Sequence, residues 1–129
     1  MLDRAFAPAF DKRLGRRMYT QNIVLRGRLD ADEWKAFLSE CIAAMGMISG
    51  GDAAAWEYPT PDGRGGRGIT VVQPMTESFI VVDAWPDHDG AYLHISSCRK
   101  FDVADLVKPV KSFGLGVELL GLWEALRLA

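Results

Sequence analysis

The sequence lacks the features that mark several large protein classes. It has only 2 cysteines in 129 residues, too few for the disulfide framework of a small secreted domain. No uncharged apolar run is long enough to span a membrane. Charged residues interrupt residues 1–17, so no signal-peptide core is present. The net charge of −2 gives no electrostatic reason to expect nucleic acid or an anionic membrane surface as a partner. These absences predict a cytoplasmic protein.

What is present is typical of one folded domain over residues 1–129. Hydrophobic residues make up 49% of the chain and charged residues 25%, which suits a single core. Pro8 and Gly15 break residues 1–16, which we expect to form a loosely held arm. Alternating or continuous apolar runs predict five strands, at 17–27, 54–58, 69–74, 79–85 and 91–97.

A helix over residues 31–45 has the clearest signals. Asp30 is a good N-cap, and Glu33 completes a capping-box pattern. One helical face carries the apolar residues Trp34, Phe37, Leu38, Cys41, Ile42 and Met45. Gly46 is a suitable stop. Because Cys41 lies within this stripe, we interpret it as a core residue without a redox or ligand role.

A second helix is expected to begin near Asp102, with an apolar face of Val103, Leu106, Val107 and Val110 and with Pro109 ending or bending it. The apolar tail over residues 114–128 fits either a last strand or a helix. This order of elements predicts an α+β two-layer sandwich, an antiparallel β-sheet with helices packed on one face.

The loop over residues 59–68 is rich in glycine and proline. It lacks the Gly-Lys-Ser/Thr of a phosphate-binding loop. Arg64 or Arg67 would be able to meet a substrate carboxylate there. A solvated hairpin loop is the interpretation that we favour.

The strands at 79–85 and 91–97 flank a turn at 87–90, which predicts an antiparallel hairpin. If Trp85 lies opposite Tyr92, then Asp83 lies opposite His94 and Phe79 lies opposite Cys98. Alternation then places these side chains on one face. This register predicts an Asp83–His94 carboxylate–imidazole pair, for which a plain ion pair is an equal alternative to an acid–base role. It also places Cys98 beside Ser78.

The stretch over residues 75–86, followed by Cys98, resembles the self-cleavage region of bacterial-type S-adenosylmethionine decarboxylases. That pattern reads roughly Glu-Ser-His-x-x-x-His-x-Trp-Pro-Glu, then a strand ending in Thr-Cys-Gly. The residues that match in identity and spacing are Glu77, Ser78, Trp85, Pro86 and Cys98. Phe79 and Asp83 stand where the pattern has histidines, and Arg99 stands where it has glycine. The chain is therefore similar to a divergent member of this family.

The resemblance implies a pyruvoyl-dependent enzyme made as a zymogen. Autocatalytic cleavage between Glu77 and Ser78 would convert Ser78 into a pyruvoyl group, which forms a Schiff base with the substrate amine. By position, Cys98 would be the proton donor, and Thr70 would supply the hydroxyl that assists processing. The family's processing histidine would be Asp83, a different acid–base group. The resemblance also implies no metal, a homodimer with sites near the interface, and a role in polyamine (spermidine) biosynthesis.

Three functions remain open on the sequence. The first is decarboxylation of S-adenosylmethionine, with Phe79, Trp85 and Arg64 as candidate substrate-binding residues. The second keeps the pyruvoyl group but takes ornithine or arginine, because Phe79 and the altered loop would reshape the pocket. The third is a non-processing homologue that binds a ligand or partner, because both histidines are replaced.

Overall fold

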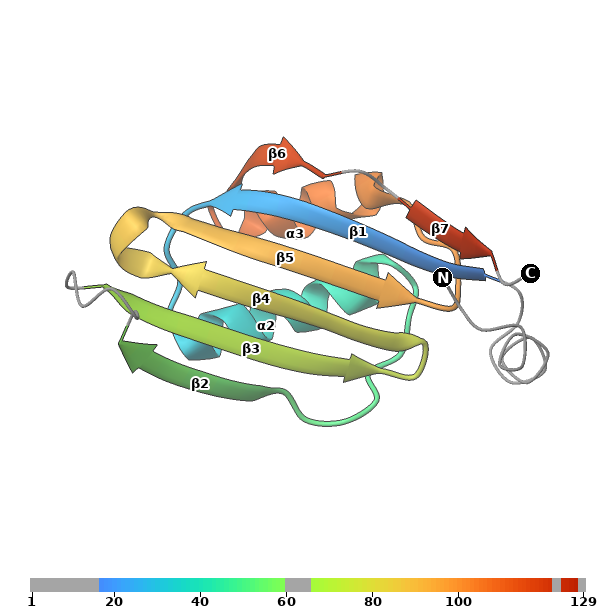
Figure 1. The fold of residues 1–129 in the computed structure, drawn as a ribbon, viewed down its shortest axis with the longest axis horizontal. Coiled ribbons are helices and arrows are strands. Elements are labelled where there is room, and N and C mark those ends of the chain that lie inside the picture. Colours follow the sequence, from blue (N-terminus) through green and yellow to red (C-terminus); the bar gives the residue numbers. More distant parts are fainter. Residues whose placement is uncertain (1–16, 60–65, 122–123, 128–129) are drawn as a thin grey trace.

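The computed structural model describes residues 17–59, 66–121 and 124–127 (Figure 1). The predicted N-terminal arm over 1–16 and most of the glycine-rich loop, Arg64 included, lie outside the described residues. The strands are β1 (Arg17–Arg26), β2 (Ala54–Pro59), β3 (Arg67–Met75), β4 (Ser78–Trp85), β5 (Gly90–Ser97), β6 (Gly116–Leu120) and β7 (Glu124–Arg127). The helices are α2 (Ala31–Ala44) and α3 (Val107–Ser112), with 3₁₀ turns η1 (Pro86–His88) and η2 (Val103–Leu106).

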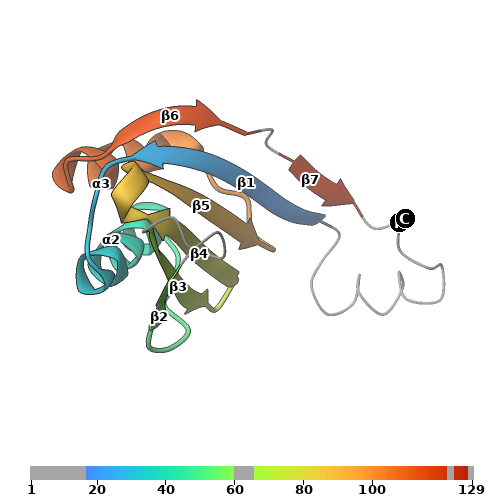
Figure 2. The same cartoon turned by 60° about the vertical axis from the view of Figure 1, so that its left-hand side comes forward.

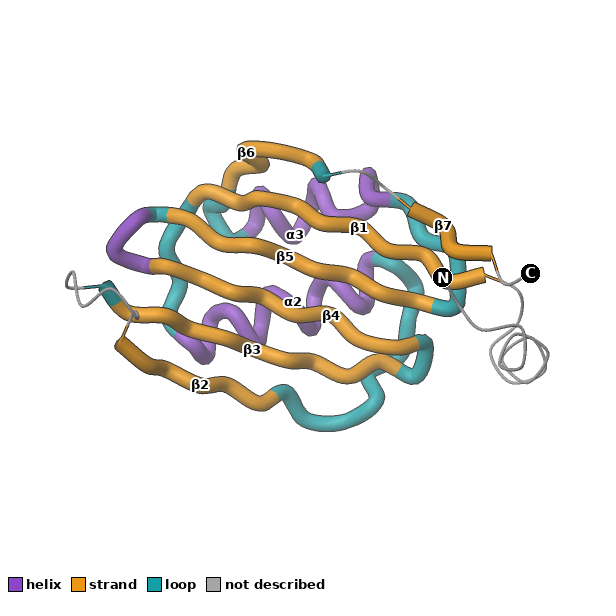
Figure 3. The backbone as a smooth tube through the Cα atoms, viewed as in Figure 1, coloured by secondary structure: helices purple, strands orange, loops and turns teal. Residues whose placement is uncertain are grey.

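The strands form one antiparallel sheet in the order β2-β3-β4-β5-β1-β6, and β7 also pairs with β1. Helices α2 and α3 cover one face of the sheet, and no described element covers the other (Figures 1 and 2). The tube in Figure 3 shows the two layers as strands in front and helices behind. The predicted α+β two-layer sandwich is confirmed.

Alternation along the strands separates the two faces. One row of residues crosses the sheet from β3 through β4 and β5 to β1 and is buried under the helices: Val71, Val82, Leu93 and Ile23. The helices contribute Trp34, Phe37 and Leu106 to the same cluster. Removing this apolar surface from water is the main force that holds helices to sheet, at about 25 cal/mol per Å². The core therefore lies wholly on one side of the sheet.

Helix α2 begins as predicted. The Asp30 side chain accepts a hydrogen bond from the Glu33 N–H at 2.8 Å, and the Glu33 side chain accepts one from the Asp30 N–H at 3.1 Å. The predicted apolar stripe is buried, Cys41 included. Burial, and secondarily the charge of Glu40, raises the pKa of the Cys41 thiol. Gly46 follows the helix with φ of 70°, a left-handed conformation that glycine adopts without strain. Cys41 is thus a core residue.

The second helical segment differs from the prediction in two ways. It starts as the 3₁₀ turn η2, capped by Asp102, and becomes α-helical only at Val107. The buried side is made by Leu106 at the end of η2 and by Pro109 and Val110 in α3. Val107 is exposed, so its predicted core position was wrong. Pro109 does not end α3, because a proline in a first helical turn removes no intrahelical hydrogen bond.

The tail forms strands rather than a helix. Strands β6 and β7 pair with the two ends of β1. The register shifts between Val24 and Leu25, which marks a bulge. The buried Gln21 side chain donates to the Gly121 carbonyl oxygen at 2.8 Å, and the Gly121 N–H donates to the Asn22 carbonyl oxygen at 2.7 Å. These bonds hold the end of β6 against β1.

The β4–β5 hairpin exists, but its predicted register was wrong by two residues. Trp85 lies opposite Gly90, and Asp83 lies opposite Tyr92. The cause is the tight connection: Pro86 opens the turn η1, and Asp89 takes a left-handed conformation with φ of 56°. A shift of two residues keeps every side chain on its face. The predicted common face of Phe79, Val81, Asp83, Trp85, Tyr92, His94 and Ser96 is therefore retained.

No helix within the described ranges has the length and apolar character needed to cross a membrane.

Candidate active site

The Glu77–Ser78 bond lies in the tight turn between β3 and β4. Met75 pairs with Ser78, so the turn itself consists of Thr76 and Glu77. Neither residue has a positive φ, and Ser78 is half-buried at the start of β4. The backbone here is short and fixed at both ends by the sheet.

The carbonyl oxygen of Glu77 accepts a hydrogen bond from the Cys98 N–H at 3.0 Å. Cys98 directly follows β5, and Ser97 at the end of that strand lies opposite Ser78. The structure therefore brings Cys98 next to the Glu77–Ser78 bond, as the sequence predicted, although by a different register. Its thiol is free and half-buried.

The Glu77 side chain is held by the connection between α2 and β2. Its carboxylate accepts hydrogen bonds from the Thr76 hydroxyl at 2.8 Å and from the Ile48 N–H at 3.3 Å. Partial desolvation raises the pKa of Glu77, but these hydrogen bonds and the nearby charge of Arg99 outweigh it, and the pKa is lowered overall. Glu77 is therefore ionised at neutral pH.

The predicted processing residues lie at the other end of the strand. Thr70 on β3 is directly opposite Asp83 on β4, and the Thr70 hydroxyl donates to the Asp83 carboxylate at 2.6 Å. Asp83 is five residues from Ser78, which at the rise of a strand is about 17 Å. Within one chain, Thr70 and Asp83 lie side by side, but neither lies near Ser78.

A third residue, Tyr58 on β2, joins this group. The Tyr58 hydroxyl lies 2.7 Å from the Thr70 hydroxyl oxygen. The single hydroxyl hydrogen of Thr70 is directed at the Asp83 carboxylate, so Tyr58 is the donor to Thr70. The result is a chain of donors, Tyr58 to Thr70 to Asp83. The Thr70 proton is thereby committed to a partner within its own chain.

Gly68 explains how Tyr58 reaches Thr70. A Cβ atom on Gly68 would lie 2.4 Å from the Tyr58 ring. A side chain at this position would therefore displace the ring, and glycine leaves the space that the ring occupies over β3. The sequence analysis did not identify Tyr58. A glycine two residues before Thr70 inside a strand was the available signal, because such a glycine often marks a close approach.

His94 does not pair with Asp83, so the predicted carboxylate–imidazole pair was wrong. His94 lies opposite Val81, and its Nδ1 is 2.6 Å from the Asn22 side-chain oxygen. Tyr92 takes the place opposite Asp83 and makes an edge-to-face contact with Trp85, with ring centroids 5.2 Å apart. The two-residue register shift is the reason for this exchange.

The open face around Asp83 is rich in aromatic side chains. One row across the sheet places Trp56, Thr70, Asp83, Tyr92 and Val24 side by side. Trp56, Tyr58, Phe79 and Tyr92 are exposed. Exposed aromatic side chains on one face of a sheet suit a cationic ligand or a second protein surface.

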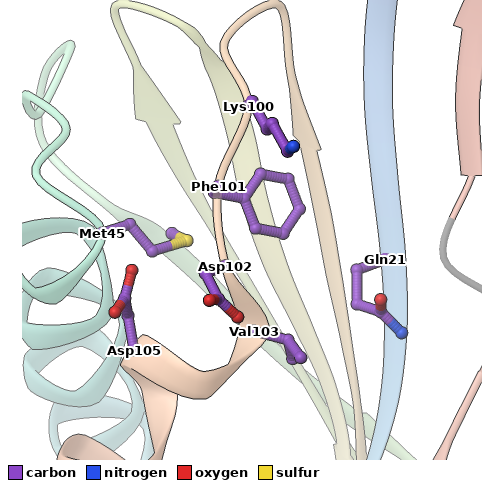
Figure 4. A pocket seen from close by; sticks show the side chains of 7 residues that line it. All are labelled: Gln21, Met45, Lys100, Phe101, Asp102, Val103 and Asp105. Carbon is purple, nitrogen blue, oxygen red and sulfur yellow. The ribbon is translucent and has the colours of Figure 1, made fainter.

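A cavity of about 560 Å³ lies elsewhere, between β1, the end of α2 and η2 (Figure 4). Its lining consists of Gln21, Met45, Lys100, Phe101, Asp102, Val103 and Asp105. None of the predicted site residues lines it. Over residues 17–59, 66–121 and 124–127, no three His, Cys, Asp or Glu side chains gather as metal ligands would.

Comparison with known proteins adds three findings. The family model described as S-adenosylmethionine decarboxylase matches residues 28–115, a span that includes Thr70, the Glu77–Ser78 bond, Asp83 and Cys98. No curated protein matches the chain. Among solved structures, the adenosylmethionine decarboxylase of Aquifex aeolicus VF5 is similar in fold, with a TM-score of 0.54 and 13% identity. The match covers 87% of this chain and 91% of that one.

Proposed function

This chain belongs to the S-adenosylmethionine decarboxylase family, and on that premise we propose that it cleaves itself at Glu77–Ser78 and acts as a pyruvoyl-dependent decarboxylase. The substrate that we propose is S-adenosylmethionine, in the cytoplasm and in the service of polyamine (spermidine) synthesis. The observation that carries the proposal is the 3.0 Å hydrogen bond from the Cys98 N–H to the Glu77 carbonyl oxygen.

That hydrogen bond supports the proposed self-cleavage. When the Ser78 hydroxyl attacks the Glu77 carbonyl carbon, negative charge develops on the carbonyl oxygen, and a preorganised N–H donor stabilises it. The peptide C–N bond breaks, and the hydroxyl proton passes to the released amine, so that the amide becomes an ester. The turn fixes both reacting groups at the start of β4.

The second step removes the nitrogen. A base takes the Cα proton of residue 78, the Cβ–O bond breaks, and the electron pair leaves on the new Glu77 α-carboxylate. Water then adds to the carbon that bears the nitrogen, and the nitrogen leaves as ammonia. The residues present fit the resulting pyruvoyl group, because a hydroxyl side chain follows a held carbonyl. That group would supply a carbonyl that accepts the electron pair released with carbon dioxide.

Cys98 is the residue that we propose as proton donor to the product carbon. Its thiol is free and half-buried, and the N–H of the same residue donates to the carbonyl oxygen of the Glu77–Ser78 bond. The steps proposed above for forming the pyruvoyl group do not use this thiol, so its proton remains available for the product carbon. A reducing compartment would keep it available.

Thr70 and Asp83, the predicted processing residues, do not lie near Ser78 in the same chain. The Thr70–Asp83 pair lies about 17 Å along the strand from Ser78. We propose a homodimer in which the open, aromatic face of one sheet meets that of a second copy. Two-fold packing of antiparallel sheets would then set the Ser78 end of one chain against the Asp83 end of the other.

Complementation tests this arrangement. A Ser78→Ala chain cannot be cut but still carries Asp83, and an Asp83→Asn chain keeps Ser78. If the site crosses the interface, co-expression should restore cleavage of the Asp83→Asn chain in the mixed dimer. Cleavage that depends only on the residues of the chain being cut would rule out the shared site. Sedimentation of the Tyr92→Lys variant, which puts a charge on the open face, should show monomer.

The intact mass of freshly purified protein under denaturing conditions tests the proposed function itself. Fragments 1–77 and a pyruvoyl-headed 78–129 are expected. Carbon dioxide release from a panel of S-adenosylmethionine, ornithine and arginine then identifies the substrate. Release from ornithine or arginine alone would favour the second enzyme function.

A specific observation favours a non-processing homologue as the alternative. The Thr70 hydroxyl proton is committed to Asp83, and neither residue is an imidazole. If the chain remains uncut for days, the open aromatic face becomes a ligand-binding or partner-binding surface instead.

A further inference from the structure

Three segments meet around Glu77. The Thr76 N–H donates to the Ile48 carbonyl oxygen at 2.9 Å, which joins the β3–β4 turn to the connection after α2. The Arg99 side chain donates from Nη1 to the Gly46 carbonyl oxygen at 3.0 Å, which joins the end of β5 to the same connection. Together with the Cys98 bond to Glu77, these contacts join the three segments around Glu77, the residue that would end the first fragment.

Cleavage changes the charge at this place. Glu77 already carries an ionised side chain, whose pKa is lowered partly by Arg99. The α-carboxylate formed by elimination adds a second negative charge on the same residue. Two carboxylates on one residue repel each other, and a nearby cation offsets this repulsion. Arg99 directly follows Cys98, whose N–H binds the Glu77 carbonyl oxygen, and its side chain is held at Gly46, two residues before the Ile48 N–H that binds the Glu77 carboxylate.

We propose that Arg99 binds the α-carboxylate created at Glu77 and keeps the end of the first fragment docked on the sheet. A guanidinium has five N–H donors, and the Gly46 contact engages only Nη1. The family pattern given above has glycine where this chain has Arg99. Binding of the new carboxylate by Arg99, which we call the anchor, is therefore a feature of this chain. The inference rests on the proposed function, because only cleavage creates the carboxylate.

The test compares one substitution in two states of the full chain. Arg99→Met removes the charge but keeps a long side chain, and Lys100→Met is the control on the neighbouring exposed cation. Both are introduced into the processed protein and into the uncut Ser78→Ala protein. Urea unfolding is measured at low and high salt.

In the processed protein, Arg99→Met should reduce the folding equilibrium constant about fivefold more than in the uncut protein, the range of an exposed ion pair. This additional loss of stability in the processed protein should disappear at high salt. Lys100→Met should affect both states equally, and Arg99→Lys should restore most of the loss.

Equal effects of Arg99→Met in the two states would overturn the anchor while leaving self-cleavage intact. A wild-type chain that is never cut would overturn the proposed function and the anchor together. The intact mass distinguishes the two failures.

Discussion

The two ends of strand β4 retain different amounts of the family pattern. At the Ser78 end, the matching residues Glu77, Ser78 and Cys98 lie together, and the Glu77 carbonyl oxygen is hydrogen-bonded. At the other end, an aspartate replaces the histidine and is bound by Thr70 and, through it, by Tyr58. The difference separates two tasks of the proposed reaction, which are holding the bond to be cut and moving protons.

The first end depends on backbone geometry, which tolerates sequence change. The donor to the Glu77 oxygen is a main-chain N–H, and the turn is fixed by strand pairing. The second end depends on side-chain chemistry, because an imidazole and a carboxylate titrate at different pH. A divergent chain can therefore keep the backbone geometry at the Ser78 end while its side chains at the Asp83 end change.

The largest effect is expected for Ser78→Ala, which removes the nucleophile. The protein should remain a single chain of full mass, whatever the incubation time. Ser96→Ala is the matched control, because Ser96 lies opposite the neighbouring Phe79 on the open face. Two fragments from the Ser78→Ala protein would mean that another residue cuts the chain.

Asp83→His restores the family residue at the altered end. An imidazole that titrates near neutral pH should speed cleavage about a hundredfold, the typical contribution of a placed acid–base group. Asp83→Asn, which keeps the shape and removes the charge, serves as control. The rate is followed by the intact mass over time. Slower cleavage with histidine would show that the Tyr58–Thr70–Asp83 chain works as a replacement.

Cys98→Ala separates the contribution of the thiol from that of the backbone at the Ser78 end of β4. Carbon dioxide release should fall about a hundredfold, while cleavage should change by less than about threefold, because the N–H bond to Glu77 remains. Cys41→Ala controls for loss of a thiol: it leaves a cavity in the core and should lower stability without altering the chemistry. Equal loss of both reactions in Cys98→Ala would assign the thiol to processing.

The smallest effect concerns Glu77, in the uncut Ser78→Ala background. Its folded pKa is lowered from the ordinary value of 4.5, so the ionised carboxylate adds stability above about pH 4.5 that is lost as the pH falls through the folded pKa. Glu77→Gln should remove this part of the acid dependence, and urea unfolding between pH 3 and 7 measures it. An unchanged acid profile would indicate that the hydrogen bonds from Thr76 and Ile48 do not favour the charged form.

Local signals in the sequence were sufficient for much of the fold. The capping pair of Asp30 and Glu33 and the apolar stripe of α2 act within a few residues, so they could be recognised without tertiary information. Alternation in β4 and β5 likewise fixed which side chains share a face. The resemblance around Glu77 and Ser78 identified the family.

Other features depend on contacts between distant segments. The hairpin register depended on the conformation of Pro86–Asp89, where a left-handed aspartate shortened the turn by two residues and separated Asp83 from His94. Tyr58 reaches Thr70 only because β2 pairs with β3 and Gly68 leaves room.

The sequence by itself determined helix α2, the first five strands, the faces of β4 and β5 and the match at Glu77 and Ser78, because these follow from capping, short-range periodicity and a local motif. Only the tertiary structure decided that Asp83 is bound by Thr70, that the Cys98 N–H binds the Glu77 carbonyl oxygen, and that the Arg99 side chain binds Gly46. Each of these contacts joins residues that are far apart in the sequence. Their positions depend on the register of the strand pairs and on the geometry of the turns.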